Sequence, residues 1–265
     1  MTRHPLPAVI IPPFRTAIRC YGVHTPAVAP LPAPAVGRSI VLKCGLGYWR
    51  FQQKHTGLDT MMKLYAFPQT RATRVVWALE EVGADYEYIK VDLLKGEGNR
   101  PAYRELNPSG KVPTFVDDDL VLTESAAICT YLGEKFPDAG LVPVAGSPQR
   151  AHYLQWCCFV IGELEQPLWT IAKHRFVLPE ERRVPAVIDT AIWEFALAAN
   201  VLAIGLGDKA FILDERFTAA DILIAHTLRW ATSYGLSLNS TRLEAYTERL
   251  LGRPAMARVQ QREQG

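Results

Sequence analysis

Two hydroxyl side chains stand where a helix is expected to begin, and both could do chemistry there. Thr70 follows a short apolar run and precedes the first helical pattern, and Ser125 precedes a later one. A helix start presents unpaired backbone N–H groups and a partial positive charge, so it suits an anion such as a carboxylate or a thiolate. Hydroxyl residues are also common N-caps, so a purely structural role stays open for both.

A third feature of this kind is the Val112-Pro113 bond, which stands at the beginning of an expected strand. An ordinary trans proline starts edge strands, whereas a cis bond costs about 0.5–1 kcal/mol and is kept for a geometric purpose. The local sequence does not decide between them. In the cis form, the backbone N–H and C=O of Val112 would be free to pair with a peptide as an added strand does.

The elements that must position these residues form a small α/β pattern over residues 62–143. Residues 63–67 predict a buried strand, and apolar residues from Val75 to Val82 recur at helical spacing before Gly83, a C-cap. A second strand, at 86–91, completes a βαβ unit with a parallel pair. The rest of the order is a short helix at 101–106, a hairpin at 113–122 around three aspartates, and a helix at 125–136.

Residues 148–265 are helical in pattern, after a linker at 143–148 that is rich in small residues and proline. Helices are expected at 149–174, 185–204, 219–234 and 243–251. Thr218 and Asp221 form a capping-box pattern at the start of one of them. We interpret Phe159, Trp169 and Trp230 as core residues of this part. The fold class is therefore an α/β domain followed by an all-α domain.

Residues 1–61 differ in composition from the rest. They hold eight prolines and seven Lys or Arg against one acidic residue, whereas the remainder carries 22 basic and 26 acidic residues. Prolines prevent regular helix, so we predict a disordered extension, with an organelle transit peptide as the alternative. The mildly acidic body gives no indication of a nucleic-acid partner. No uninterrupted apolar run approaches the roughly 20 residues that span a bilayer.

Five cysteines are spread without a CxxC spacing, so neither a disulfide framework nor a zinc site is indicated. We interpret them as buried small hydrophobes in a reducing compartment, which favours a cytoplasmic location. His152 and His174 lie far apart and lack a ligand cluster, so no metal site is expected.

Four segments together resemble the cytosolic glutathione transferases. They are Lys63 to Val75, Asn107 to Pro113, Leu122 to Ile128 and Phe217 to Asp221, in the family's order and spacing. The resemblance covers about 200 residues. It implies a thioredoxin-like N-terminal domain at 62–143 that binds glutathione, and an all-helical C-terminal domain at 148–265.

The resemblance also implies roles for individual residues. Val112-Pro113 would be cis, and the backbone of Val112 would pair with the cysteinyl part of glutathione. Ser125 would bind the γ-glutamyl carboxylate, Glu124 would meet the ammonium group, and Lys111 would serve the glycyl end. Some relatives carry a histidine for that end. Here its place is taken by Gly98, with Asn99 or Arg100 as substitutes.

The residue that activates the glutathione thiol is implied to be Thr70, which stands where serine-type transferases carry serine. Thr73, inside the helix, is the competing candidate, and Tyr65 lies too early to match the catalytic tyrosine of other classes. The absence of cysteine at position 70 weakens a disulfide-exchange mechanism.

These implied roles predict a homodimeric enzyme that conjugates the glutathione thiolate to small electrophilic apolar substrates, with glutathione as co-substrate. The alternatives are glutathione-dependent isomerase, dehalogenase or peroxidase activity, or a non-catalytic binding or scaffolding protein of the same fold.

Overall fold

A computed structural model describes residues 43–44, 47–48 and 61–264. The chain divides into two compact units, Met1–Gly57 and Leu58–Gly265. In the first unit, strand β1 (Lys43–Cys44) pairs antiparallel with β2 (Gly47–Tyr48). The rest of the predicted extension, including Cys20, lies outside the described residues.

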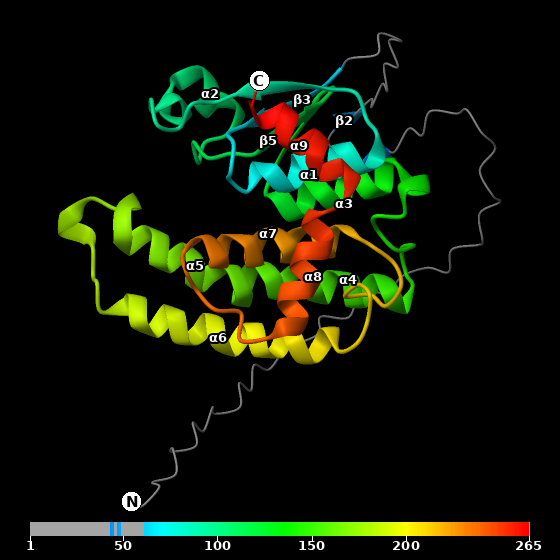
Figure 1. Cartoon of the computed structure of the whole chain (residues 1–265). Helices are drawn as coiled ribbons and strands as arrows, with labels where there is room; N and C mark the ends of the chain where they lie inside the picture. Colours follow the sequence, from blue (N-terminus) through cyan, green and yellow to red (C-terminus); the bar gives the residue numbers. More distant parts are fainter. Residues whose placement is uncertain (1–42, 45–46, 49–60, 265) are drawn as a thin grey trace, which may run out of the picture. The chain divides into compact units, whose positions relative to one another are not determined.

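The second unit begins with a four-stranded mixed sheet in the order β4-β3-β5-β6 (Figure 1). Its strands are β3 (Met62–Ala66), β4 (Tyr86–Lys90), β5 (Thr114–Asp117) and β6 (Leu120–Thr123). The β3–β4 pair is parallel and the other pairs are antiparallel, as the βαβ unit and the hairpin predict. The thioredoxin-like fold class is confirmed.

Helices α1 (Ala72–Val82) and α3 (Ser125–Lys135) pack side by side against the sheet. Val75, Ala78 and Leu79 of α1 are fully buried, and Gly83 ends the helix in the left-handed conformation, with φ 67°. Glycine adopts that conformation without steric cost, which is why it serves as the C-cap. The other elements of this domain are the 3₁₀ turns η1 (Glu97–Asn99) and η2 (Pro137–Ala139), and α2 (Pro101–Leu106).

The C-terminal part is mostly helical. A long helical stretch contains two π-helical segments and runs through α4 (Pro148–Phe159), η3 (Val160–Leu164), α5 (Glu165–Ala172) and η4 (Lys173–Val177). The 3₁₀ turn η5 (Glu180–Arg182) leads to α6 (Val187–Leu206), α7 (Ala219–Ser233), α8 (Thr241–Leu251) and α9 (Pro254–Gln264). The pattern did not single out α9, which lies along α1 in Figure 1.

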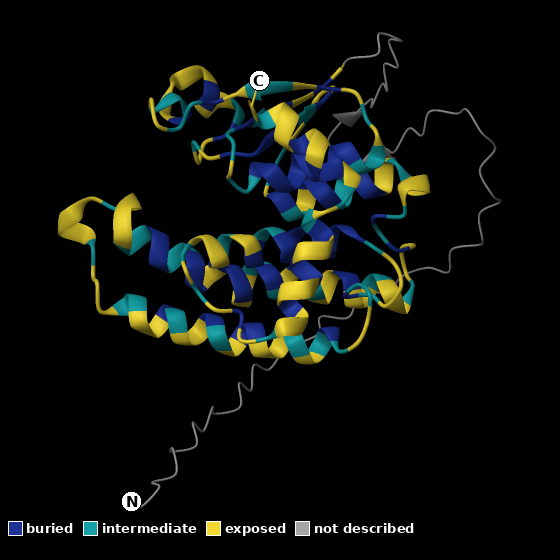
Figure 2. Ribbon diagram, in the orientation of Figure 1, coloured by how far each residue is buried: buried dark blue, intermediate teal, exposed yellow. Residues whose placement is uncertain are grey.

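Helix α7 lies at the centre of the helical part and contacts both α1 and α3. Its buried residues are dark blue in Figure 2, where α7 faces the α/β domain. The predicted capping box is confirmed, because the Asp221 carboxylate accepts from the Thr218 N–H at 2.8 Å. Asp221 also accepts from the Tyr246 hydroxyl at 2.6 Å, so α7 and α8 are joined at this end.

Helix α6 packs against α5 and leaves one face open. One side of α6 is coloured as exposed in Figure 2. Trp193, Leu197, Val201 and Ile204 are exposed there, with 62% of Trp193 and 73% of Ile204 accessible to solvent. By length and composition alone α6 could cross a membrane, but such a single helix is weak evidence for a span. Its sequence also carries Asp189 and Glu194.

Candidate active site

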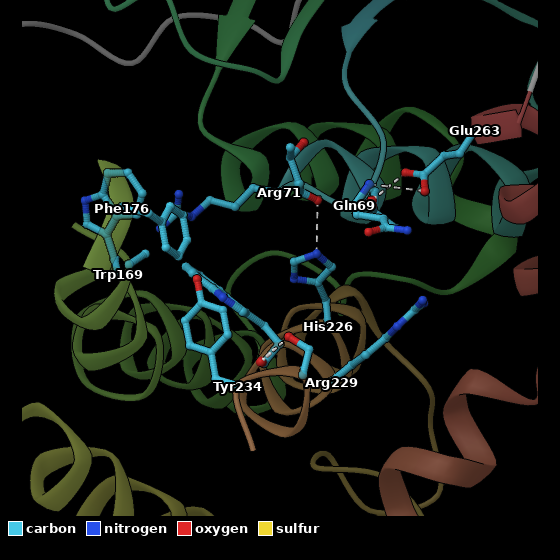
Figure 3. Close-up of a pocket in the computed structure, with 13 residues that line it drawn as sticks. Gln69, Arg71, Trp169, Phe176, His226, Arg229, Tyr234 and Glu263 are labelled. Atoms are coloured by element: carbon cyan, nitrogen blue, oxygen red, sulfur yellow. Dashed lines mark hydrogen bonds between the residues drawn. The ribbon is translucent and has the colours of Figure 1, made fainter. Parts of the chain in front are cut away.

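The turn before α1 and helices α5, α7 and α9 line one pocket, shown in Figure 3. Trp169, Phe176 and Tyr234 gather at one side of the pocket, and Gln69 and Glu263 lie at the other. The remaining lining residues are Thr70, Arg71, Thr73, Ala172, His226, Arg229, Trp230 and Ser233. The pocket therefore combines an aromatic wall with a polar floor, where a helix begins.

Thr70 lies on this floor and is partly buried. Its hydroxyl donates to the Phe67 carbonyl at 2.7 Å and accepts from the Ala72 N–H at 3.2 Å. The hydroxyl thus satisfies one free N–H of the first turn of α1, although the N-cap position is Arg71 and not Thr70 as the structural alternative expects. A hydroxyl can rotate to another acceptor, so capping and thiol activation are compatible.

Thr73 and Glu263 form the polar side of the pocket. The buried Thr73 hydroxyl donates to Glu263 at 2.5 Å, and the Gln69 N–H donates to the same carboxylate at 3.4 Å. Burial raises the pKa of Glu263, although both hydrogen bonds oppose the rise. Gln69 has φ 58°, a left-handed conformation that is costly for a residue with a β-carbon. Helix α9 therefore helps to hold the turn that carries Thr70.

Arg71 extends from the floor toward the aromatic wall. Its guanidinium lies 5.0 Å from the Trp169 ring centroid and 5.1 Å from that of Trp230, and its Nε donates to Glu165 at 2.5 Å. The interpretation of Trp169 as a core residue is wrong, because it lines the pocket, whereas Trp230 both packs against the core and lines the pocket. Phe159 does pack against the core. Sequence spacing places all three on helices but does not reveal which helix face meets α1.

Behind the floor, Arg74 is fully buried and pairs with Glu165. Arg74 also donates to Thr227 at 2.8 Å and to the Ser125 hydroxyl at 3.3 Å. Burial alone would raise the pKa of Glu165, but Arg74 and Arg71 outweigh it and hold that pKa below its usual value. The pair therefore ties α1 to α5 and α7 through charges that are shielded from water.

His226 of α7 contacts the floor directly. Its Nε2 lies 3.0 Å from the Thr70 carbonyl oxygen, and its Nδ1 lies 3.1 Å from Nε of Arg74. Figure 3 shows the ring below the turn that carries Gln69 and Arg71. Burial, followed by the charge of Arg74, lowers the pKa of His226 well below its ordinary value, so the ring is neutral at physiological pH.

The Val112-Pro113 bond is cis, as the family resemblance predicts. Tyr103 and Asn107 hold Lys111 and Thr114, the residues on either side of the Val112-Pro113 pair. Tyr103 donates to the Lys111 carbonyl at 2.5 Å and lies 2.8 Å from the Thr114 hydroxyl, while Asn107 donates to the same two oxygens at 2.8 and 3.0 Å. Within the described residues, the backbone of Val112 has no hydrogen-bond partner.

Glu124 and Ser125 stand at the start of α3, as expected. Glu124 is exposed and has φ 67°, a conformation that costs a residue with a side chain about 1–3 kcal/mol. Ser125 is buried, with its hydroxyl toward Arg74. The N-terminal N–H groups of α3 thus lie beside a buried cation, which strengthens the attraction for a carboxylate.

Lys111 is exposed, but its Nζ lies 5.7 Å from the Trp169 ring centroid, so it reaches the aromatic wall from the α/β domain. Gly98 cannot be replaced easily, because a β-carbon there would lie 2.2 Å from the Gly110 carbonyl oxygen. Asn99 accepts from Arg104 and Arg100 pairs with Glu97, so both are engaged locally at the surface. Neither lines the pocket.

The described cysteine side chains do not join the site. Cys129 and Cys157 are buried, as predicted, and burial raises the pKa of each to about 12. Cys158 is exposed, which corrects the interpretation that the cysteines are buried. Neighbours at adjacent helix positions point about 100° apart, so only one of them can face the core. Within residues 61–264 no cluster of three metal-binding side chains is present.

Sequence reasoning missed Glu165, His226 and Glu263, which hold the floor from three different helices. Each is a lone polar residue in a helical pattern, and nothing in its spacing distinguishes it from a surface residue. Of the three, Glu165 has the clearest sequence signal of burial, because its neighbours Leu164, Pro167 and Leu168 are apolar. An acid among such neighbours is buried only when it is paired.

The comparisons with known proteins agree with this geometry. Residues 60–134 match the family described as glutathione S-transferase, N-terminal domain. Glutathione S-transferase GstA of Escherichia coli O157:H7 is 31% identical over 198 residues, which cover 73% of this chain and 94% of that protein. Disulfide-bond oxidoreductase YfcG of Escherichia coli K12 is 32% identical over 61% of this chain and 76% of the relative.

A solved glutathione transferase from Methylococcus capsulatus superposes with a TM-score of 0.70 at 28% identity, covering 77% of this chain and 98% of that structure. The ternary complex of BphK, a bacterial glutathione transferase, superposes with a TM-score of 0.67 at 28% identity over 76% and 98% of the two chains. The chain therefore belongs to the glutathione S-transferase family of transferase enzymes.

Proposed function

We propose that this chain binds glutathione along the Val112-Pro113 edge and joins its thiolate to small electrophilic substrates with apolar or aromatic bodies. One observation carries the proposal: Thr70, at the start of α1, opens into the pocket whose far wall is aromatic. A nucleophile held at Thr70 and an electrophile stacked on that wall would be neighbours, which lowers the entropic part of the barrier.

Glutathione has a peptide backbone, two carboxylates and an ammonium group, and the α/β domain has a complement for each. The unpaired backbone of Val112 suits the cysteinyl part, and the start of α3 with Ser125 suits the γ-glutamyl carboxylate. Glu124, exposed and negatively charged, suits the ammonium group. Lys111 is free to approach the glycyl carboxylate.

The proposed chemistry is a nucleophilic substitution on an activated aryl chloride or a similar compound. The thiol proton leaves to solvent, the thiolate sulfur forms the new carbon–sulfur bond, and chloride departs with the electron pair of the broken carbon–chlorine bond. A free thiol has a pKa of about 8.5, so a site that stabilises the thiolate increases the reactive fraction at neutral pH. Thr70 supplies a hydroxyl donor for that purpose.

The test combines retention on immobilised glutathione with turnover of an activated aryl chloride. We expect Thr70→Ala to keep retention and to lower kcat/KM about 10- to 100-fold, because a hydrogen bond to a charged group contributes about 1.5–3 kcal/mol. Thr70→Ser is the matched control and should retain most of the activity. If Thr70→Ala turns over like the unaltered protein, Thr70 does not activate the thiol.

The substrate panel should include a small disulfide, since one relative is named as a disulfide-bond oxidoreductase. Described cysteines do not line the pocket, so any disulfide exchange there would proceed through glutathione sulfur. Turnover of the disulfide together with none of the aryl chloride would replace conjugation by that reaction.

We also propose that the chain forms a homodimer that covers the open face of α6. The apolar stripe of Trp193, Leu197, Val201 and Ile204 is the supporting observation, because an exposed row of apolar side chains of this kind marks an interaction surface. Light scattering at micromolar concentration should give twice the chain mass. Replacing Trp193 and Leu197 by glutamate should give the single chain mass, and a monomeric unaltered protein would contradict the proposal.

A further inference from the structure

We propose that His226 is a positioning residue for thiol activation. From the helical domain it holds the peptide between Thr70 and Arg71, and it thereby sets the direction of the Thr70 hydroxyl and the Arg71 N–H relative to the sulfur. This inference rests on the proposed function, because it takes the glutathione sulfur to lie at Thr70. His226 itself does not exchange a proton with the substrate in this scheme.

The two ring nitrogens have assigned roles because their partners allow only one arrangement. Nε of Arg74 is always a donor, so Nδ1 of His226, 3.1 Å away, must accept. The proton of the neutral ring is therefore on Nε2, where it is donated to the Thr70 carbonyl oxygen at 3.0 Å. With its lone pair already occupied by Arg74, the ring has no free base to offer a thiol.

The orientation of the Thr70 carbonyl affects both the preceding turn and the first turn of α1. The carbonyl also accepts the first helical hydrogen bond of α1, from Thr73 N–H at 3.0 Å, so it lies where the turn becomes helix. The peptide that joins Thr70 to Arg71 is planar and trans, so its N–H points opposite to its carbonyl. Fixing the carbonyl therefore fixes the Arg71 N–H, for which residues 61–264 offer no hydrogen-bond partner.

Burial and the surrounding positive charges keep the His226 ring neutral. Arg71 and Arg74 face it from α1 and Arg229 from its own helix, while Glu165 of α5 pairs with the first two and Glu263 of α9 lies across the pocket. Burial is the largest cause of the lowered pKa, the three arginines add to it, and the hydrogen bond to Thr70 opposes it. The donor on Nε2 is thus present throughout the neutral pH range.

The experiment separates the two hydrogen bonds of the ring. In His226→Asn the side-chain oxygen takes the place of Nδ1 and still accepts from Arg74, but no donor reaches Thr70. In His226→Gln the longer side chain brings an amide N–H to the Thr70 carbonyl. Thr227→Val is the control, because Thr227 contacts Arg74 at 2.8 Å and belongs to the same helix. The readouts are the pH titration of thiolate absorbance in the glutathione complex and steady-state kinetics.

We expect His226→Asn to raise the pKa of the bound thiol by about one unit and to lower kcat/KM about tenfold at neutral pH, the effect of one hydrogen bond. The KM for glutathione should change less than twofold. His226→Gln should restore most of both values, and Thr227→Val should leave the thiol pKa in place.

Two results would overturn the inference: an unchanged thiol pKa in His226→Asn, or an equal shift in Thr227→Val, which would place the effect in Arg74. If His226→Asn does not fold, His226→Met takes its place, because methionine fills a similar volume without making either hydrogen bond. The pKa of the bound thiol must then be raised in His226→Met, and an unchanged pKa there would also overturn the inference. An unaltered protein without thiolate signal or turnover would instead refute the proposed function.

Discussion

The turn before α1 and the edge that carries Val112 and Ser125 lie in one domain, yet they are held in different ways. The turn is fixed by side chains from distant helices, namely Glu165, His226 and Glu263, through charges and hydrogen bonds. The edge is fixed by close neighbours in the chain, such as Asn107 and Tyr103 on the two sides of Val112-Pro113.

In the proposed function, this difference separates the binding of glutathione from the activation of its thiol. The part of the edge around Val112-Pro113 depends on local contacts, so we expect its shape to vary little with changes in the helical part, and its backbone groups suit a peptide-like ligand. A turn that depends on long-range contacts takes its properties from the helical part, so changes in α5, α7 or α9 should alter reactivity more than affinity.

The largest expected effect comes from removing the charge that ties the turn to the helical part. Glu165→Gln leaves Arg74 buried without its anion, and breaking a buried ion pair in this way costs about 3–5 kcal/mol. Urea unfolding should show that loss in the free energy of unfolding. The matched control is Glu87→Gln, whose pair with Lys63 spans 3.9 Å between half-exposed side chains and should change it by less than about 0.5 kcal/mol.

The same carboxylate predicts a pH dependence. Because Arg74 and Arg71 hold the pKa of Glu165 below the unfolded value of 4.5, its contribution to stability is complete above that pH and is lost as pH falls through the folded value. The unaltered protein should therefore lose more stability between pH 5 and pH 3 than Glu165→Gln does, with both curves measured by urea unfolding at about half-unit steps. Parallel curves would mean that the pair does not keep Glu165 ionised.

A smaller effect is expected from adding a side chain at Gly98, which packs against the segment that leads to Lys111 and Val112. Gly98→Ala would place a β-carbon against the Gly110 carbonyl oxygen, and forcing extra volume into a packed site costs about 1–3 kcal/mol. The melting temperature should fall, and glutathione affinity should fall with it, since residue 110 precedes Lys111 and Val112. Gly162→Ala is the control, because a β-carbon there meets no atom within 4 Å.

The smallest effect concerns the hydroxyl at the start of α3. Ser125→Ala removes one hydrogen bond to a carboxylate, so we expect the KM for glutathione to rise about tenfold, for about 1.5 kcal/mol, while kcat stays within about twofold. Ser233→Ala, at the pocket wall, should leave that KM unchanged. A fall in kcat in Ser125→Ala equal to the rise in KM would show that the edge takes part in activation through Arg74.

The sequence predicted the recognition side well because its signals are local. The strand and helix order, the Gly83 cap and the helix start at Ser125 each depend on a few adjacent residues, whereas the cis Val112-Pro113 bond is predicted by the family resemblance alone. The structure bears all of these out.

The activation side could not be predicted in the same way, for a physical reason. Glu165, His226 and Glu263 are separated from Thr70 by between 95 and 193 positions in the chain, and only tertiary packing brings them to one pocket. That Trp169 and Trp230 line the pocket could not be predicted either, because an apolar helix face looks alike whether it meets another helix or lines a cavity. Helix α9 was not singled out because its sequence is mostly polar.

The stacking of Arg71 between Trp169 and Trp230 gives this protein an optical signal of its own. Indole emission responds to nearby charge and to aromatic quenchers, and a ligand entering the pocket meets both rings within the same wall. Acceptor binding can therefore be followed by the intrinsic fluorescence of the unlabelled chain. Trp77, Trp156 and Trp193 do not line the pocket, so they contribute a background emission that the ligand does not contact.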